Sequence, residues 1–487
     1  MKNQPDTLLS SLSVGLAILI LLLLNGCAVQ STGKDSSSVV TDLPAQWSEQ
    51  TASANSINPT WWRDFASAEL DKLIAQGLQN NPDMGIATER IVQAEAQARI
   101  AGASLFPVLS GSAGATHRET RGGNTANADA ASNSSSGTNG GNSSNSSNSI
   151  SLGLSASYEF DFWGKNAAGV RAASSQQQAS QFDRDSLRLT LIAGIASGYF
   201  QILAVRERLL VARDNLAIAR RVLHVVEARV RYGAAAQLDL TRQRSTVLNQ
   251  EAAIPPLQLQ EQQGLYALAI LLGQVPPGFQ VAGDKLQQLQ LPAIAAGIPA
   301  SLLHSRPDLA SAETQLAVAN ANIDAARAAL FPSISLSSSL GLASDSLRGL
   351  VNAPLTSFNL TAGLVQAIFD GGRLRGQVSI AESRQRELLL FYRKAVLTSL
   401  ADVNSALAAS SRSQTLEALL QSGLQESELA LRLSEVRYRA GADDLLVLLD
   451  AQRSLYQAQD QITQIRLSRL QAQLGLYKAL GGGWTKA

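Results

Sequence analysis

The sequence predicts an α+β membrane protein built from two internal repeats, each contributing two transmembrane β-strands and a pair of long helices. Three observations carry this prediction. Short sequence motifs recur far apart in the chain, several segments alternate apolar with polar residues, and long proline-free segments have apolar residues at helical spacing.

The recurring sequence motifs indicate an internal duplication. Asn81-Pro82-Asp83 opens an Ala/Gln-rich segment ending at Phe106-Pro107, and Arg306-Pro307-Asp308 opens one ending at Phe331-Pro332, an offset of 307 − 82 = 225. Further along, the offset is 208, with six matched pairs: Leu216, Arg229, Gly233, Leu238, Leu268 and Gly273 against Leu424, Arg437, Gly441, Leu446, Leu476 and Gly481. A duplicated unit of this size predicts a pseudo-symmetric architecture.

Composition excludes several classes of protein. The chain has 487 residues, of which 45% are hydrophobic and 16% charged, so it can bury a large core and is not a disordered protein. Its formal net charge of +1 gives no support for a nucleic-acid surface or a polybasic membrane patch.

The N-terminus has the pattern of a lipoprotein signal. Residues 1–26 contain the apolar run from Val14 to Leu24 and end just before Cys27, the single cysteine of the chain. The position of Cys27 predicts cleavage before it and thioether lipidation, which supplies stable multi-chain anchoring. Ala28 favours the outer membrane. A simple transmembrane anchor is the alternative. No cofactor is expected beyond this covalent lipid, and residues 27–60 form the lipidated extension.

Four segments have the period-2 pattern of β-strands, at about 107–118, 150–162, 332–343 and 357–369. In the second copy, Ile334, Leu336 and Leu340 alternate with serines. The alternative is the half-buried face of a soluble sandwich. The strand length of about 9 to 11 residues and the small polar residues on the opposite face favour membrane strands around a wet lumen.

Four strands cannot close a barrel, and open strand edges are not tolerated in lipid. The remaining strands must therefore come from other subunits: a homotrimer would supply twelve, and a dimer of eight is also permitted. The Gly/Asn/Ser-rich tract from Thr120 to Ser149 is expected to be the extracellular loop of the first hairpin.

Two long segments, from about Ala167 to Tyr232 and from Arg375 to Arg439, lack proline and have apolar residues at helical spacing. After a turn, each is followed by a returning helix that ends at Gly273 or Gly481. The repeats then span residues 61–273 and 306–481, joined by a linker at 274–305 and followed by a tail at 482–487. Paired helices with apolar seams are typical of coiled coils, so a non-conducting envelope scaffold is an alternative.

The chain resembles the TolC-like outer membrane factor family, in its NodT-type or OprM-like lipoprotein branch. The residues that carry this resemblance cover nearly all of the mature chain. They are Trp61-Trp62, Phe65, Leu70 and Leu73-Ile74; Ser305-Arg306-Pro307-Asp308-Leu309, Ala312-Glu313 and the run from Ala325 to Ile334; Arg437-Tyr438-Arg439-Ala440-Gly441 with the run from Leu448 to Ser454; and the run from Leu476 to Trp484.

The resemblance implies the passive exit duct of a tripartite efflux system for small molecules such as drugs, toxic compounds or metal ions. Its implied partners are two more copies of the chain, a periplasmic adaptor and an inner-membrane transporter of RND type, and its location is the cell outer membrane. The residues predict no enzyme, because His117, His224 and His304 are scattered and no nucleotide- or metal-binding spacing occurs. A duct for type I protein secretion is the alternative within the same fold.

Two sets of site residues are expected. Leu446, Asp450 and Arg453 share one helix face through their i, i+4, i+7 spacing, and they match family positions that narrow the periplasmic aperture. We expect a gate of charge and apolar constriction there, with a local surface ion pair as the alternative. The adaptor is expected to touch the tips of the helix pairs, whose residues are Arg229, Gly233, Arg437, Tyr438 and Gly441.

Overall fold

The computed structural model describes residues 44, 46–47, 57–121, 144–292, 294, 296–297 and 299–486. These form two compact units. One contains residues 96–173 and 318–384, and the other contains the described residues before 96 together with 174–317 and those from 385 onward. The predicted signal peptide and Cys27 lie outside the described residues.

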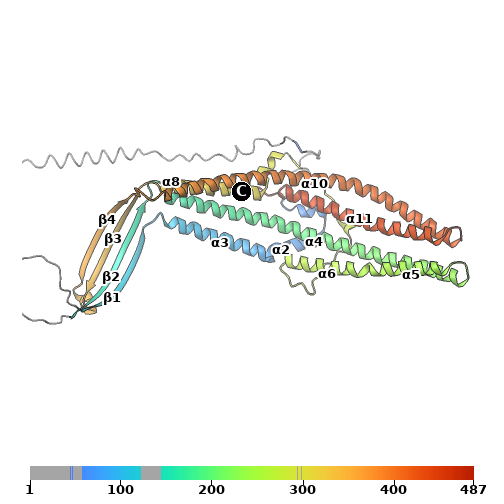
Figure 1. Ribbon diagram of the computed structural model, residues 1–487, viewed down its shortest axis with the longest axis horizontal. Coiled ribbons are helices and arrows are strands. Elements are labelled where there is room, and N and C mark those ends of the chain that lie inside the picture. Colours follow the sequence, from blue (N-terminus) through green and yellow to red (C-terminus); the bar gives the residue numbers. More distant parts are fainter. Residues whose placement is uncertain are drawn as a thin grey trace, which may run out of the picture. The chain divides into compact units, whose positions relative to one another are not determined.

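The first unit holds a four-stranded antiparallel sheet. Its strands are β1 (Val108–Arg121), β2 (Ser144–Phe160), β3 (Ser333–Ser344) and β4 (Leu355–Val365), and they lie side by side in the order of the sequence (Figure 1). The two hairpins therefore come from the two repeats and are joined through β2 and β3. The four predicted strands are confirmed.

The strand register separates an apolar face from a polar one. Leu154 lies opposite Leu340, which in turn lies opposite Phe358, and all three are exposed at 45 to 67% in the single chain. On the other face, the Ser110 and Ser155 hydroxyls lie 2.9 Å apart. An apolar outer face and a polar inner face are the arrangement expected of a strand between lipid and a wet lumen.

The first hairpin is longer than the alternation predicts. The tract from Thr120 to Ser149 was expected to be loop throughout, but Ser144 to Ser149 belong to β2 and pair with β1 from Thr116 to Arg121. This prediction was wrong at both ends because ladder hydrogen bonds are made by the backbone, so serine and asparagine can continue a strand whose partner is already in place. The middle of the tract, residues 122–143, lies outside the described residues.

Strand β4 is shorter than predicted and ends at Val365 instead of near residue 369. Val365 pairs with Ser333, the first residue of β3. Pro332, the residue before Ser333, has no backbone N–H to donate to the ladder, so the pairing of β3 with β4 stops at Ser333 and Val365. The connection between β3 and β4 holds a short helix that the alternation did not predict, α9 (Leu347–Asn352), capped by the Ser346 hydroxyl.

The helices repeat with the offsets of the sequence. Helices α3 (Pro82–Ala103) and α8 (Pro307–Ala328) both have 22 residues, and α4 (Lys165–Arg231) and α10 (Arg373–Arg439) both have 67. Helices α4 and α10 begin 373 − 165 = 208 residues apart, the same offset as the repeated sequence motifs. The duplication seen in the sequence is therefore also present in the structure.

The two returning helices differ. The second is a single 35-residue helix, α11 (Leu445–Ala479), whereas the first is divided into α5 (Gln237–Ala252) and α6 (Ile254–Leu271). An unbroken first returning helix was therefore the wrong expectation. Pro255 and Pro256 have no N–H groups to continue the helical ladder, but they are tolerated in the first turn of α6.

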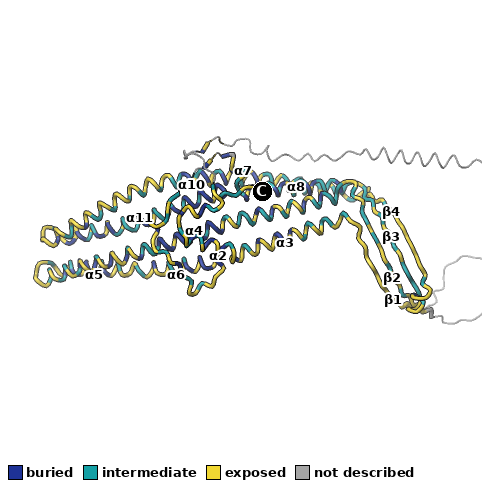
Figure 2. The backbone as a smooth tube through the Cα atoms, turned by 180° about the vertical axis from the view of Figure 1, so that it is seen from behind, coloured by how far each residue is buried: buried dark blue, intermediate teal, exposed yellow. Residues whose placement is uncertain are grey.

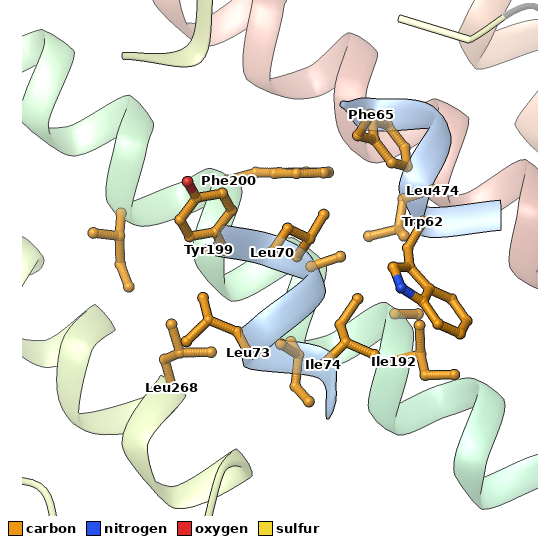
Figure 3. Close-up of a cluster of buried hydrophobic side chains, with 14 of the residues drawn as sticks. Trp62, Phe65, Leu70, Leu73, Ile74, Ile192, Tyr199, Phe200, Leu268 and Leu474 are labelled. Carbon is orange, nitrogen blue, oxygen red and sulfur yellow. The ribbon is translucent and has the colours of Figure 1, made fainter. Parts of the chain in front are cut away.

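The core of the second unit lies where η2 (Trp61–Phe65) and α2 (Ala68–Asn80) meet α4, α6 and α11. Figure 3 shows Phe65 and Leu70 pointing toward Phe200 of α4, with Leu268 of α6 and Leu474 of α11 on either side. The Trp61 ring stacks on Tyr477 at 4.7 Å, and the Tyr477 hydroxyl donates to Asp64 at 2.6 Å. These aromatic contacts add to the apolar burial at this meeting point.

Residues 481–484 pack against the edge of this core. Gly481, Gly482 and Gly483 all have positive φ, at 88°, 59° and 74°. A Cβ atom on Gly481 would lie 1.8 Å from the Ser305 carbonyl oxygen, so only glycine fits. The run brings Trp484 against Phe182, with its indole N–H donating to Asp185 at 3.0 Å.

The remaining described elements connect the repeats. Between α6 and α8 lie η3 (Leu286–Gln288), η4 (Pro299–Ser301) and α7 (Leu302–Ser305). Glu69 of α2 holds part of this connection through hydrogen bonds from the backbone N–H groups of Ala282 and Gly283. The Tyr199 hydroxyl also donates to Glu69, and burial raises the pKa of Tyr199 to about 12.

Candidate functional site

Both long helices end in the same left-handed turn. Gly233 and Gly441 each have φ of 75°, a value that glycine adopts without strain. The Ala234 N–H donates to the Arg229 carbonyl at 2.7 Å, and the Ala442 N–H donates to the Arg437 carbonyl at 2.9 Å. This is the Schellman pattern of a helix C-terminus, and it places the two predicted glycines at the two tips. Figure 2 shows that the turns at these tips are mostly exposed.

At the first tip, Arg229 turns toward the second. Its guanidinium donates to the Tyr438 carbonyl at 2.5 Å and lies 4.5 Å from the centre of the Tyr438 ring. Tyr438 is only 3% exposed and packs in a cluster that includes Val226 and Leu448. Burial raises the pKa of the Tyr438 hydroxyl. These two predicted residues therefore hold the tips together and present little surface of their own.

At the second tip, Arg437 turns outward. Its guanidinium makes a bidentate pair with Asp443, at 2.7 and 2.9 Å, and its side chain is 60% exposed. The hydrogen bonds from Arg437 lower the pKa of Asp443. Arg437 is thus the predicted tip residue that remains available to a partner.

The predicted gate residues lie at the start of α11. Asp444 caps this helix, accepting from the Leu446 and Val447 N–H groups at 2.8 and 3.2 Å. Leu446 is 52% exposed, and Asp450 pairs with Arg453 at 2.5 Å with both side chains exposed. The local surface pair of the sequence alternative is therefore present, and it lies on the face that also carries Leu446.

The sequence reasoning missed two features of this region. Tyr232 at the first tip is 82% exposed, and the only signal for it was an aromatic residue immediately before the turn glycine. A cavity of about 600 Å³ lies beside Asp450 and Arg453, with walls from α5 and α11. Its lining depends on which faces of two separate helices meet, and residue spacing does not reveal that.

The described residues contain no cluster suited to a metal ion. No group of three or more His, Cys, Asp or Glu side chains within this part of the chain could hold one. The His117 imidazole contacts the Asn148 side chain at 2.6 Å in the first hairpin, and His224 lies 3.8 Å from Glu227 on α4.

Comparison with known proteins gives a consistent result. The model of the outer membrane efflux protein family matches residues 73–274 and 298–482. The pyoverdine export outer membrane protein OpmQ of Pseudomonas aeruginosa is 41% identical over 466 residues, covering 95% of each chain. The probable outer membrane lipoprotein SilC of Salmonella typhimurium is 30% identical and covers 97% of this chain and 99% of its own.

The solved structures agree with the sequence relatives. The outer-membrane channel OprN superposes with a TM-score of 0.81 at 25% identity, covering 93% of this chain and 99% of that one. The predicted fold, outer-membrane location and trimeric partnership are confirmed, and the scaffold alternative is wrong because the relatives are channels. The chain therefore belongs to the outer membrane efflux protein family, and it is the outer-membrane channel of a tripartite efflux system that works with a periplasmic adaptor and an inner-membrane pump.

Proposed function

We propose that Leu446, Asp450 and Arg453 form the periplasmic gate of this channel. The observation that carries the proposal is the exposure of all three side chains on one face of α11, just beyond the second tip. In a trimer, Asp450 gives a ring of three carboxylates and Leu446 gives an apolar constriction. Such rings and constrictions regulate conduction by charge and by dewetting.

The experiment is single-channel conductance of the purified trimer in planar bilayers. Asp450→Ala should raise the conductance several-fold by removing the charged ring and its link to Arg453. The matched control is Arg242→Ala, because residue 242 occupies the position of Asp450 in the first repeat (450 − 208 = 242) and is also exposed. Unchanged conductance in Asp450→Ala, or an equal rise in Arg242→Ala, would contradict the gate.

We propose further that the adaptor docks on the tips, with unlike roles for the predicted residues. Arg437 contacts the adaptor, and its exposure and outward direction support this role. Arg229 and Tyr438 position the turns, while Gly233 and Gly441 allow them to form. Two tips in each of three protomers provide six quasi-equivalent docking sites.

Surface plasmon resonance with the purified adaptor tests these roles. Arg437→Ala should weaken adaptor binding while leaving the trimer intact. Arg229→Ala should also weaken adaptor binding, but because Arg229 positions the turns, this loss should be accompanied by faster hydrogen exchange at both tips. Undiminished binding by Arg437→Ala would remove this residue from the interface.

We propose that Cys27 carries the lipid that anchors the mature chain. The lipobox pattern ending at this residue supports the assignment, as does the similarity to a probable outer membrane lipoprotein. Mass spectrometry of the extracted protein should find a diacylglyceryl thioether on a chain that begins at Cys27. Cys27→Ser should lack it, and an unmodified cysteine in the wild type would refute the proposal.

The mature chain would then consist of the extension 27–60, the repeats 61–273 and 306–481 joined by 274–305, and the tail 482–487. The repeat boundaries are supported by the equal lengths of α3 and α8 and of α4 and α10.

We propose that the exported cargo is a small molecule of the pyoverdine kind. The support is the similarity to OpmQ along 95% of both chains, and no catalytic role is assigned to the duct. Expressed in a Pseudomonas aeruginosa strain that lacks OpmQ, the chain should restore pyoverdine to the medium. Failure to restore it, with the protein present in the outer membrane, would reject this cargo. Secretion of a polypeptide in its place would favour the type I alternative.

A further inference from the structure

Within one chain, the long helix of the first repeat packs on the returning helix of the second. The Tyr456 hydroxyl of α11 donates to the Asn215 carbonyl of α4 at 3.3 Å. Arg208 of α4 pairs with Asp460 of α11 at 2.6 Å. Val222 of α4 is buried in an apolar cluster that it shares with α11. The internal interface therefore covers one face of α4, at positions 208, 215 and 222, and one face of α11, at positions 456 and 460.

The equivalent face of α10 is exposed. The repeat offset of 208 converts the three α4 positions into 416, 423 and 430 (208 + 208 = 416, 215 + 208 = 423 and 222 + 208 = 430). Leu416, Gly423 and Ala430 are exposed, and Leu419 and Leu433 on the same face are 66 and 55% exposed. Successive members of this set are three, four, seven and three residues apart, which is the spacing of a heptad seam. Helix α10 thus carries a seam of apolar and small residues that its own chain leaves exposed.

The equivalent face of α5 and α6 is exposed as well. Subtraction of the offset converts positions 456 and 460 of α11 into Leu248 and Ala252 of α5, and both are exposed (456 − 208 = 248 and 460 − 208 = 252). Further along, Leu467 of α11 packs against the aromatic core, whereas its counterpart Leu259 of α6 is 55% exposed. The first repeat thus has the returning-helix half of the interface without a long helix to cover it.

The two exposed faces lie at opposite edges of the helices that lead to the tips. Figure 1 shows α10 and α5 on the outside of this group, with α11 and α4 between them. Contact between two different faces of identical chains is heterologous, and it produces a ring when the rotation between copies closes. The trimer supplies such a ring.

We propose that α10 of each protomer packs on α5 and α6 of the next protomer, in the register with which α4 packs on α11 inside the chain. Gly423 then lies opposite Leu248 of the partner subunit, and Leu416 lies opposite Ala252 of the partner subunit. The duplication sets this register because both interfaces pair a long helix with a returning helix. Interfaces within and between protomers then alternate around the helical part of the trimer.

In this register the two interfaces have different chemistry. Leucine, glycine and alanine side chains cannot form the hydrogen bond and the ion pair that hold α4 to α11. A Cβ atom on Gly423 would meet nothing within 4 Å in the single chain, so the space over Gly423 is open to a leucine side chain of the partner subunit. The contact between protomers is therefore apolar at the two positions where the internal interface has polar links. It depends on neither the proposed gate nor the proposed adaptor site.

Chemical cross-linking of the full-length protein in outer-membrane fractions tests the register. Gly423→Cys combined with Leu248→Cys should give covalent dimers and trimers with a short bismethanethiosulfonate linker. Asn215→Cys combined with Tyr456→Cys is the matched control, because these equivalent positions should be linked within one chain and stay at monomer mass. Each single substitution controls for reaction at Cys27.

A shifted pair shows whether the register is specific. Position 241 lies two helical turns from position 248, about 10 Å along α5. Thr241→Cys combined with Gly423→Cys should therefore give much less covalent trimer. Equal yields from the two pairs, linkage of positions 423 and 248 within one chain, or no linkage at all would overturn the proposal. Leu416→Cys with Ala252→Cys tests the same register if the first pair does not reach the outer membrane.

A second experiment transfers the internal ion pair to the contact between protomers. Leu416→Arg and Ala252→Asp together place an arginine and an aspartate at the positions equivalent to Arg208 and Asp460. Each single substitution should lower the temperature at which the trimer dissociates in SDS, because it buries an unpaired charge. The double variant should regain much of this loss. A double variant that is no more stable than either single variant would contradict the register.

Discussion

The two tips have the same backbone but different side-chain chemistry. Gly233 and Gly441 have identical φ values and equivalent hydrogen bonds, yet Arg229 points inward to Tyr438 whereas its counterpart Arg437 points outward to Asp443. The counterparts of Tyr438 and Asp443 in the first repeat are Val230 and Ala235, which can make neither contact (438 − 208 = 230 and 443 − 208 = 235).

This difference shows what the duplication preserves. The turn is set by a glycine and by backbone hydrogen bonds, so both copies keep it while their side chains diverge. A trimer therefore has six turns of one shape but three of each chemistry. A partner that recognises shape meets six sites, and one that recognises charge meets three.

The largest expected effect comes from breaking the contact between the tips. Tyr438→Ala removes a buried aromatic ring and leaves the Arg229 guanidinium without its stacking partner, so local stability should fall by about 3 to 5 kcal/mol. Hydrogen exchange should increase in residues 222–231 as well as 431–440. Val230→Ala, at the corresponding position in the first repeat, should have a much smaller effect. Equal effects would mean that the tips are not mechanically different.

The two glycines should be equivalent. Alanine at position 233 or 441 would have to adopt the left-handed conformation, at a cost of about 1 to 2 kcal/mol each. Neither substitution meets a steric clash, since the nearest atom to a Cβ on Gly441 is an Arg229 nitrogen at 3.9 Å and Gly233 has none within 4 Å. Hydrogen exchange of Gly233→Ala and Gly441→Ala should report losses of similar size. A loss at only one tip would show that the shared turn geometry hides a difference.

The first turns of α11 and α5 should change in stability in opposite directions when their capping positions are substituted. Asp444→Ala removes the cap of α11 and should destabilise its first turn by about 1 kcal/mol. At the corresponding position, Ala236 has extended backbone geometry but no capping side chain. Ala236→Asp should therefore stabilise the start of α5 by a similar amount. Exchange rates of the first-turn amides give both values, and no gain at α5 would indicate that Asp239, which accepts from the Ala236 N–H at 3.2 Å, already satisfies that end.

The smallest effect is a pH response confined to the second tip. Arg437 lowers the pKa of Asp443 below its ordinary value of 3.8, so the contribution of this pair is present above that value and is lost as the pH falls through the lowered pKa. Hydrogen exchange at Ala442 and neighbouring amides, corrected for intrinsic rates, should be steady from neutral pH to about pH 5 and should rise only in stronger acid. The first tip should show no such step, and Asp443→Asn should abolish it.

Much of the fold could be predicted because it depends on local periodicity. Alternation in the strands placed Leu154, Leu340 and Phe358 on one face, and the matched words located the two long helices. The continuation of β2 through Ser144 could not be read, because it depends on backbone pairing with a strand already present. The break before α6 follows from Pro255 and Pro256, which are local signals in the sequence.

The part of the candidate site that lies on a single helix could be predicted, and the contacts between helices could not. Leu446, Asp450 and Arg453 share a helix face through sequence spacing alone. The contact of Arg229 with Tyr438 joins residues 209 positions apart, and the cavity beside Asp450 requires two helices to be placed together. Interactions between repeats are set by packing, which a single sequence does not display.

The glycine run at 481–483 has a consequence for biosynthesis. Tyr477 donates to Asp64 across 413 residues of sequence, and Trp484 packs against Phe182, so these contacts of the second unit cannot form until residues 477–484 have been synthesised. A chain terminated after residue 480 would keep the stack of Trp61 on Tyr477 but would leave Phe182 without Trp484, so we expect it to be cleaved by protease more readily than the full chain.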